Sequence, residues 1–167
     1  MRRTASLTLS FLGVLLLAGS APAGVSLSAT TSTASFSVSL SGSDQTVSYS
    51  NVGLTVTENG QQNGWALQVT STVYTGGAHT LPTDATMITQ VSVGACTGSA
   101  CPVNSVGLPV TVPAAATAPP PVKFFDAAAG TGTGTVTVTP AFSTTVPGNS
   151  FAGSYQSTIT FSSVVGP

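Results

Sequence analysis

The sequence predicts an all-β fold, an antiparallel β-sandwich of Greek-key-like connectivity with about eight or nine strands. The first observation is a period-two alternation of apolar and hydroxyl residues, in segments rich in Val, Thr, Phe and Ile. The second is a series of turn signals that separate these segments at roughly even spacing. The third is that no window of about 11 residues has the apolar face of a helix. Together these patterns are typical of an antiparallel sandwich or barrel, and we expect the sandwich.

The strands expected from the alternation follow one another along most of the chain. The first alternates Phe36, Val38 and Leu40 with serines, so that one of its faces is apolar. The expected strands are 35–41, 45–50, 53–58, 65–74, 86–93, 106–112, 122–125, 135–140 and 154–165. The segment PAAATAPPP, residues 113–121, is too rich in proline for a central strand. We therefore expect it to be a crossing connection within the domain.

The first 23 residues have the pattern of a secretory signal peptide. Arg2 and Arg3 form a basic start, an apolar run follows, and Ala21-Pro22-Ala23 matches the small-x-small pattern of a cleavage site. The apolar run is too short for a membrane span. We expect cleavage after Ala23, which leaves residues 24–167 as one secreted sandwich domain without a transmembrane segment.

The composition is poor in charge, and this excludes some classes of partner. Only 4% of the residues are charged. After loss of the leader, Lys123 is the one basic residue against four carboxylates. Nucleic-acid binding needs clustered Lys and Arg, so we expect no nucleic-acid partner. A surface made mainly of hydroxyl and amide groups suits a protein that lies in a matrix or packs against copies of itself.

Two cysteines, Cys96 and Cys101, are separated by four residues that include Gly98. An even number of cysteines in an exported chain favours a disulfide, and a short glycine-containing loop can bring the two Cα atoms within bridging range. The alternative is a metal site. A metal site lacks support because the chain has no second cysteine pair and only one histidine.

Residues for catalysis are scarce, so we expect no enzyme activity, no metal and no cofactor. A nucleophilic triad needs a base, and His79, the one histidine, lies in a glycine-containing turn. The stretch GTGTGTV, 130–136, has no following Lys or helix and reads as a turn. Turn-stabilising roles are expected for the four carboxylates, which lie in or near turns: Asp44, Glu58, Asp84 and Asp126.

The stretch LTVTENGQQNGWALQVTSTVYT, 54–75, resembles the first signature of bacterial WxL domains. That signature is an extended run, a polar turn that ends in Gly, and then Trp-x-Leu-x-Val. The matching residues here are Gly64, Trp65, Leu67 and Val69. A tryptophan on an apolar strand face is either a core anchor or a platform for sugar stacking, and its face-mates Leu67, Val69 and Val73 favour the core.

The C-terminal stretch YQSTITFSSVVGP resembles the distal motif of the same family. Matching positions are Tyr155, Ile159, Thr160 and Pro167, while Phe161 stands where the family has a second Trp and Ser163 where it has Leu. The stretch 124–140 is also similar to the region that precedes this motif. The resemblance therefore spans about residues 45–167 and identifies the chain as a divergent WxL-like member.

The resemblance implies an exported, non-enzymatic domain that attaches noncovalently to the cell wall, with peptidoglycan as the ligand and other surface proteins as partners. Neutral glycan would be met by hydroxyls, amides and exposed aromatic rings such as Tyr49, Tyr74 and Tyr155. A second hypothesis is a structural subunit of a surface layer or fibre, which would pair with copies of itself through strand edges. We expect the C-terminal strand to pack beside the strand of Trp65.

Overall fold

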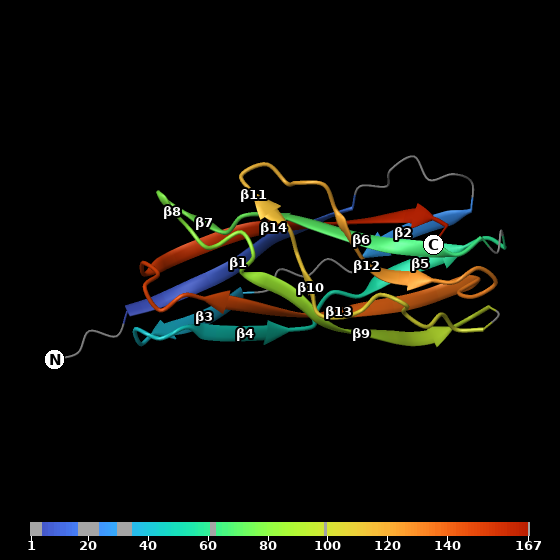
Figure 1. Cartoon of the computed structure of the whole chain (residues 1–167), viewed down its shortest axis with the longest axis horizontal. Helices are drawn as coiled ribbons and strands as arrows, with labels where there is room; N and C mark the ends of the chain where they lie inside the picture. Colours follow the sequence, from blue (N-terminus) through green and yellow to red (C-terminus); the bar gives the residue numbers. More distant parts are fainter. Residues whose placement is uncertain (1–4, 17–23, 30–34, 61–62, 99, 167) are drawn as a thin grey trace.

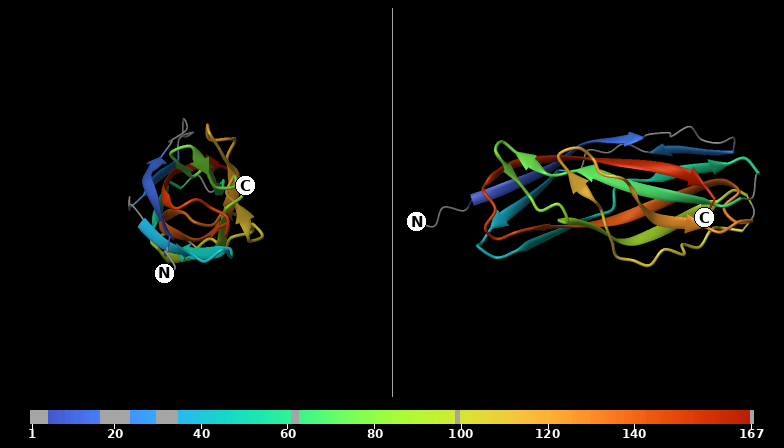
Figure 2. Two further views of the ribbon diagram at one scale, coloured as in Figure 1. Left: turned by 90° about the vertical axis from the view of Figure 1, so that its left-hand side faces the viewer. Right: turned by 45° about the horizontal axis from the view of Figure 1, so that its top comes forward.

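The chain folds into two mostly antiparallel sheets that pack face to face. The computed structural model describes residues 5–16, 24–29, 35–60, 63–98 and 100–166. These residues form fourteen strands and no helix. The strands run along the long axis of the molecule (Figure 1), and the two sheets surround a common interior (Figure 2). The all-β sandwich expected from the alternation is confirmed.

The first sheet has eight strands, and its main path runs β11-β6-β14-β1-β3. Its strands are β1 (Ala5–Leu16), β3 (Ser35–Leu40), β6 (Trp65–Thr72), β7 (Thr75–Gly76), β8 (His79–Thr80), β11 (Ala114–Ala115), β12 (Val122–Ala127) and β14 (Gly153–Val165). β14 lies between β6, to which it is antiparallel, and β1, to which it is parallel. β12 pairs with the other edge of β6, so that β6 is a central strand.

The second sheet has six strands, and its main path runs β10-β9-β13-β5-β2. Its strands are β2 (Val25–Ala29), β4 (Gln45–Tyr49), β5 (Leu54–Glu58), β9 (Thr86–Cys96), β10 (Val110–Thr111) and β13 (Gly134–Val146). β13 pairs with β9 along one edge and with β5 and then β4 along the other. This long strand therefore organises the second sheet as β14 organises the first.

Eight strands agree with the expected segments, and the differences have physical causes. The segment expected at 106–112 shortens to Val110–Thr111. β13 continues to Val146, because Pro140 sits within the strand and does not end it. The other unexpected strands are β1 and β2 in the N-terminal region and the two-residue strands β7, β8 and β11, which are too short to produce an alternation.

The proline-rich segment 113–121 is tied to the edge of β6. β11 pairs in parallel with β6 at Ser71 and Thr72. The Thr70 hydroxyl donates to the carbonyl oxygen of Pro119 at 2.7 Å, and the backbone N–H of Ser71 donates to that of Pro113 at 3.0 Å. Proline has no backbone N–H to donate, so this segment is held to β6 through its carbonyl groups, which accept hydrogen bonds.

The N-terminal segment is part of the first sheet in the uncut chain. β1 lies between β14 and β3, and its Leu7 and Leu9 are fully buried. The predicted cleavage after Ala23 would therefore remove a middle strand, and not only a tail. Cleavage itself stays a prediction.

Candidate functional site

Trp65 is a core residue at the start of β6. Its side chain is fully buried, its ring stacks on that of Phe125 with centroids 5.2 Å apart, and its indole N–H donates to the carbonyl oxygen of Gly132 at 3.2 Å. A buried indole normally has such a partner. In this fold the tryptophan has no surface to present to a sugar, and it acts as a structural anchor.

Gly64 allows the chain to turn tightly into Trp65. Its φ is +73°, and a Cβ placed there would lie 2.5 Å from the carbonyl oxygen of Ala127. Only glycine tolerates both the left-handed backbone and this close approach. The glycine that precedes the tryptophan in the motif is therefore required by the fold.

The two motifs lie side by side on adjacent strands. In the antiparallel register of β14 and β6, Val165 is opposite Trp65 and Phe161 is opposite Val69. Phe161 also meets the rings of Phe124 and Phe142 edge-on, with centroids 5.9 and 6.2 Å away. The remaining motif residues are buried as well: Gly64, Leu67, Tyr155, Ile159 and Thr160. Pro167 lies outside the described residues.

The three tyrosines expected to be exposed are buried instead, which corrects that expectation. The phenol hydroxyls of Tyr49 and Tyr74 lie near each other in the interior. Beside them are the hydroxyls of Thr86 and Thr144, whose oxygen atoms are 3.0 Å apart. Burial raises the pKa of Tyr74 to about 12 and raises the pKa of Tyr49 further. Alternation shows which residues share a strand face, but it does not show which face becomes covered.

The disulfide between Cys96 and Cys101 is confirmed, with the two Cα atoms 5.6 Å apart. The loop that it closes packs on the segment before β13. The backbone N–H of Gly132 donates to the carbonyl oxygen of Ala100 at 2.9 Å, and that of Thr135 to the Thr97 hydroxyl at 2.9 Å. Gly132 also accepts the hydrogen bond of the Trp65 indole. The disulfide loop therefore contacts the same segment that covers Trp65.

Asp44 and Glu58 accept hydrogen bonds in turns, as expected, whereas Asp126 lies within β12 and binds a loop residue. Asp44 accepts a hydrogen bond from the backbone N–H of Gly148 at 2.9 Å, and Glu58 accepts one from that of Gly60 at 3.0 Å. Asp126 accepts from the Ser105 hydroxyl at 3.0 Å and pairs with Lys123 at 3.4 Å. Within the part of the chain that the structure describes, no three His, Cys, Asp or Glu side chains come together as metal ligands would. No helix among these residues is long and apolar enough to span a membrane.

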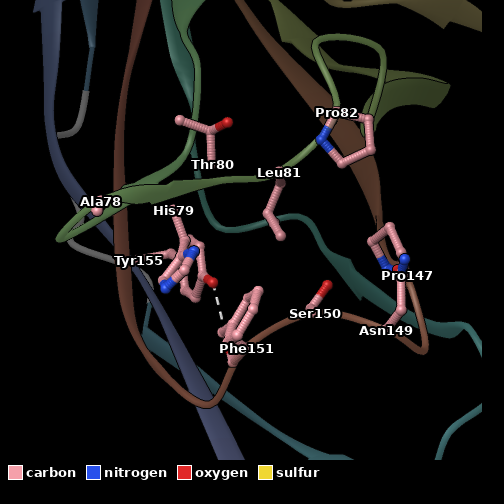
Figure 3. Close-up of a pocket in the computed structure, with 10 residues that line it drawn as sticks. All are labelled: Ala78, His79, Thr80, Leu81, Pro82, Pro147, Asn149, Ser150, Phe151 and Tyr155. Atoms are coloured by element: carbon pink, nitrogen blue, oxygen red, sulfur yellow. Dashed lines mark hydrogen bonds between the residues drawn. The ribbon is translucent and has the colours of Figure 1, made fainter.

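An open pocket lies at the opposite end of the first sheet from Trp65, where β14 begins. It is formed by the β7–β8 hairpin and by the turn between β13 and β14, and its volume is about 510 Å³ (Figure 3). Its lining consists of Ala78, His79, Thr80, Leu81, Pro82, Pro147, Asn149, Ser150, Phe151 and Tyr155. None of these side chains carries a carboxylate or an ammonium group.

The chemical centre of this pocket is a stacked pair of rings. The imidazole of His79 lies on the ring of Phe151 with centroids 3.8 Å apart and planes inclined by 11°. Phe151 keeps 61% of its surface exposed, and the Tyr155 hydroxyl donates to its carbonyl oxygen at 3.2 Å. The buried Tyr155 therefore fixes the backbone of Phe151, whose ring is exposed.

Sequence reasoning assigned His79 to a solvated turn and did not consider Phe151. The two residues are 72 positions apart, so no local pattern joins them. One feature of the sequence could have pointed to Phe151. Its large apolar ring directly follows the polar turn PGNS, 147–150, where side chains are usually exposed.

A second hollow region follows the outer face of β6 and β14, beside the proline-rich segment. Two adjoining pockets of about 400 Å³ each share Thr72 and Thr158. Their lining is rich in hydroxyl groups, and it includes Pro119 and Pro121 on the side of the connection. The lining of these two pockets has no aromatic ring, so it offers a sugar no stacking surface like that of His79 and Phe151.

Comparison with known families and proteins adds no identification. No protein-family model matches the chain, and no curated protein matches it.

Proposed function

We propose that this chain is a secreted, non-enzymatic bacterial surface domain that associates noncovalently with the cell wall and binds its glycan, peptidoglycan, at the His79–Phe151 pocket. Export rests on the leader pattern of residues 1–23, with cleavage after Ala23. The class of protein rests on the resemblance of residues 45–167 to WxL domains.

The observation that carries the binding site is the stacked ring pair of His79 and Phe151 in a pocket that has no carboxylate or ammonium group. The apolar faces of sugar rings pack on aromatic rings, and their hydroxyls need hydrogen-bond donors and acceptors in fixed positions. Phe151 and His79 supply the aromatic stacking surface. The hydrogen-bonding groups come from Asn149, Ser150 and Thr80. The lining has no carboxylate, ammonium or guanidinium group, and this suits an uncharged saccharide better than a phosphate or a peptide carboxylate.

In this proposal the Trp65 motif maintains the fold and does not touch the ligand. Trp65 is buried at the end of the sheet where β14 finishes, Phe161 is buried opposite Val69, and the pocket lies at the other end, where β14 begins. Loss of Trp65 or Phe161 would then abolish wall binding only by unfolding the domain, whereas Tyr155 of the distal motif lines the pocket itself.

The test is a pull-down on purified wall sacculi with single variants of the exported protein. Phe151→Ala and His79→Ala should weaken binding about three- to tenfold each, because a stacked ring contributes about 0.5–1.5 kcal/mol beyond its buried area. Val103→Ser is the matched control, since Val103 is 81% exposed and lies outside the pocket lining. Unchanged binding by both ring variants, with normal melting curves, would remove the pocket from the proposal.

The second candidate function is a structural subunit that assembles through strand pairing. It is favoured by the position of β1, whose removal would open the edge of β14, a strand of 13 residues. Open edges of this length pair readily with other chains. Concentration-dependent filaments in electron micrographs of the exported protein would favour this function over wall binding.

A further inference from the structure

β1 holds a position in the first sheet that requires a strand. It lies between β14, to which it is parallel, and β3, to which it is antiparallel (Figure 1). In this register Leu7 is opposite Val38 and Leu9 is opposite Phe36. Both leucines are fully buried. Among the described residues, β3 joins the first sheet through β1 alone. Removal of β1 would thus leave β14 with an open edge and β3 without a partner in this sheet.

This inference rests on the proposed export, because cleavage after Ala23 removes β1 from the mature chain. An unfilled middle position exposes backbone N–H and C=O groups on both neighbouring strands and uncovers apolar side chains that β1 had buried. The mature protein therefore needs a replacement strand with apolar residues at alternate positions.

The first segment of the mature chain repeats the apolar and hydroxyl pattern of β1. ASLTLS, residues 5–10, and VSLSAT, residues 25–30, agree position by position at an offset of 20 residues. In both segments an apolar residue is followed by Ser and Leu, and then by a hydroxyl residue, an apolar residue and a second hydroxyl residue. Leu27 corresponds to Leu7 and Ala29 to Leu9. The segment that contains β2 can therefore present the same pattern to the core.

β2 lies at the edge of the second sheet. Among the described residues its one strand partner is β5, with Ser28 opposite Thr55. Five residues separate β2 from β3, a length that β-hairpin connections use. If Leu27 pairs with Val38 in a hairpin, Ala29 falls opposite Phe36. These are the partners that Leu7 and Leu9 have in the uncut chain.

We propose that loss of the leader makes β2 leave β5 and take the place of β1 between β14 and β3. The strand exchanges an edge position with one neighbour for a middle position with two, which restores backbone hydrogen bonds on both sides. The same chain supplies the strand, because a five-residue tether gives it a far higher effective concentration than a second copy has.

Paired cysteines on exposed residues report the position of β2. The variant Ser28→Cys/Ser37→Cys should form a disulfide within the exported chain, because the exchanged register places these two residues opposite each other. The matched variant Ser28→Cys/Thr55→Cys tests the register of the uncut chain, in which the Ser28 hydroxyl donates to the Thr55 carbonyl oxygen at 3.5 Å. Intact mass and peptide mapping identify the N-terminus and the bridge, and the native Cys96–Cys101 bridge is an internal reference.

The expected result is an exported chain that begins at Gly24 and carries the 28–37 bridge in most molecules, with little 28–55 bridge in the matched variant. A dominant 28–55 bridge would overturn the proposal, as would retention of residues 1–23. A 28–37 bridge between two chains would also overturn it and would favour the strand-pairing subunit. Sacculus binding is measured on the same samples, so failure of wall binding leaves the result on strand exchange unaffected.

Discussion

The indole N–H of Trp65 donates to the carbonyl oxygen of Gly132, and this 3.2 Å hydrogen bond joins residues 67 positions apart. The contact needs the glycine, because a Cβ at position 132 would lie 2.8 Å from the indole nitrogen. The glycine-rich stretch before β13 thus closes over the tryptophan of β6. The tryptophan that follows Gly64 thus takes part in a long-range structural contact.

Replacement of Trp65 should unfold the domain rather than only reduce binding. Trp65→Ala removes a fully buried ring that stacks on Phe125, and we expect a loss of about 3–5 kcal/mol in the free energy of unfolding. Trp65→Phe keeps a ring beside Phe125 but orphans the Gly132 carbonyl, so it should cost less. Urea titration followed by circular dichroism measures both. A normal transition for Trp65→Ala, combined with lost wall binding, would contradict the structural role.

Gly64 and Gly130 form a matched pair that separates steric conflict from backbone strain. Both have positive φ, +73° and +80°, but only at Gly64 would a Cβ meet backbone atoms. Gly130→Ala should cost about 1–2 kcal/mol, the ordinary penalty of a left-handed alanine. Gly64→Ala should cost clearly more, because the backbone around Ala127 must move. Equal melting temperatures for the two variants would show that the turn before Trp65 adapts freely.

The disulfide should stabilise the domain modestly. Cys96 and Cys101 are five positions apart, and so short a loop restricts the unfolded chain by only about 2 kcal/mol. The double variant Cys96→Ser/Cys101→Ser should still fold, with a lower midpoint in urea. Its loop at Gly132 should become more sensitive to proteolysis, because the Ala100 contact is no longer held. A variant that fails to fold would mean that this loop organises the whole Trp65 end.

Alkaline pH should destabilise the protein through the buried tyrosines. The pKa of Tyr74 is raised in the folded state to about 12 and that of Tyr49 is raised further, mainly by burial. The unfolded chain loses these protons first, so stability is complete below about pH 10 and falls as the pH rises above it. For Tyr74 alone the loss is about 2 kcal/mol at pH 12.

Urea midpoints measured across this pH range, with phenolate absorbance in parallel, test the alkaline prediction. The control is Tyr49→Phe/Tyr74→Phe, which should have a flatter dependence on pH. Phenolate formation from Tyr49 and Tyr74 with an ordinary titration curve in the still-folded protein, taken as the difference between the parent and the double variant, would contradict it.

The sequence by itself determined the fold class, most of the strands and the disulfide. These depend on local properties, because alternation follows from the pleat of a strand and a bridge over four residues needs only a short loop. In the stretch 65–72 the alternation correctly grouped Trp65, Leu67 and Val69 on one face, and these residues lie in the core.

Only the tertiary structure decided which strands became neighbours and which faces were covered. Backbone pairing is non-local and little dependent on sequence, so nothing local shows that β14 lies between β6 and β1. The same reason explains the tyrosines: Tyr49 and Tyr74 became buried because strands from two sheets close over them. It also explains why His79 and Phe151 were not expected to meet, since they come together only when the β7–β8 hairpin packs against the turn before β14.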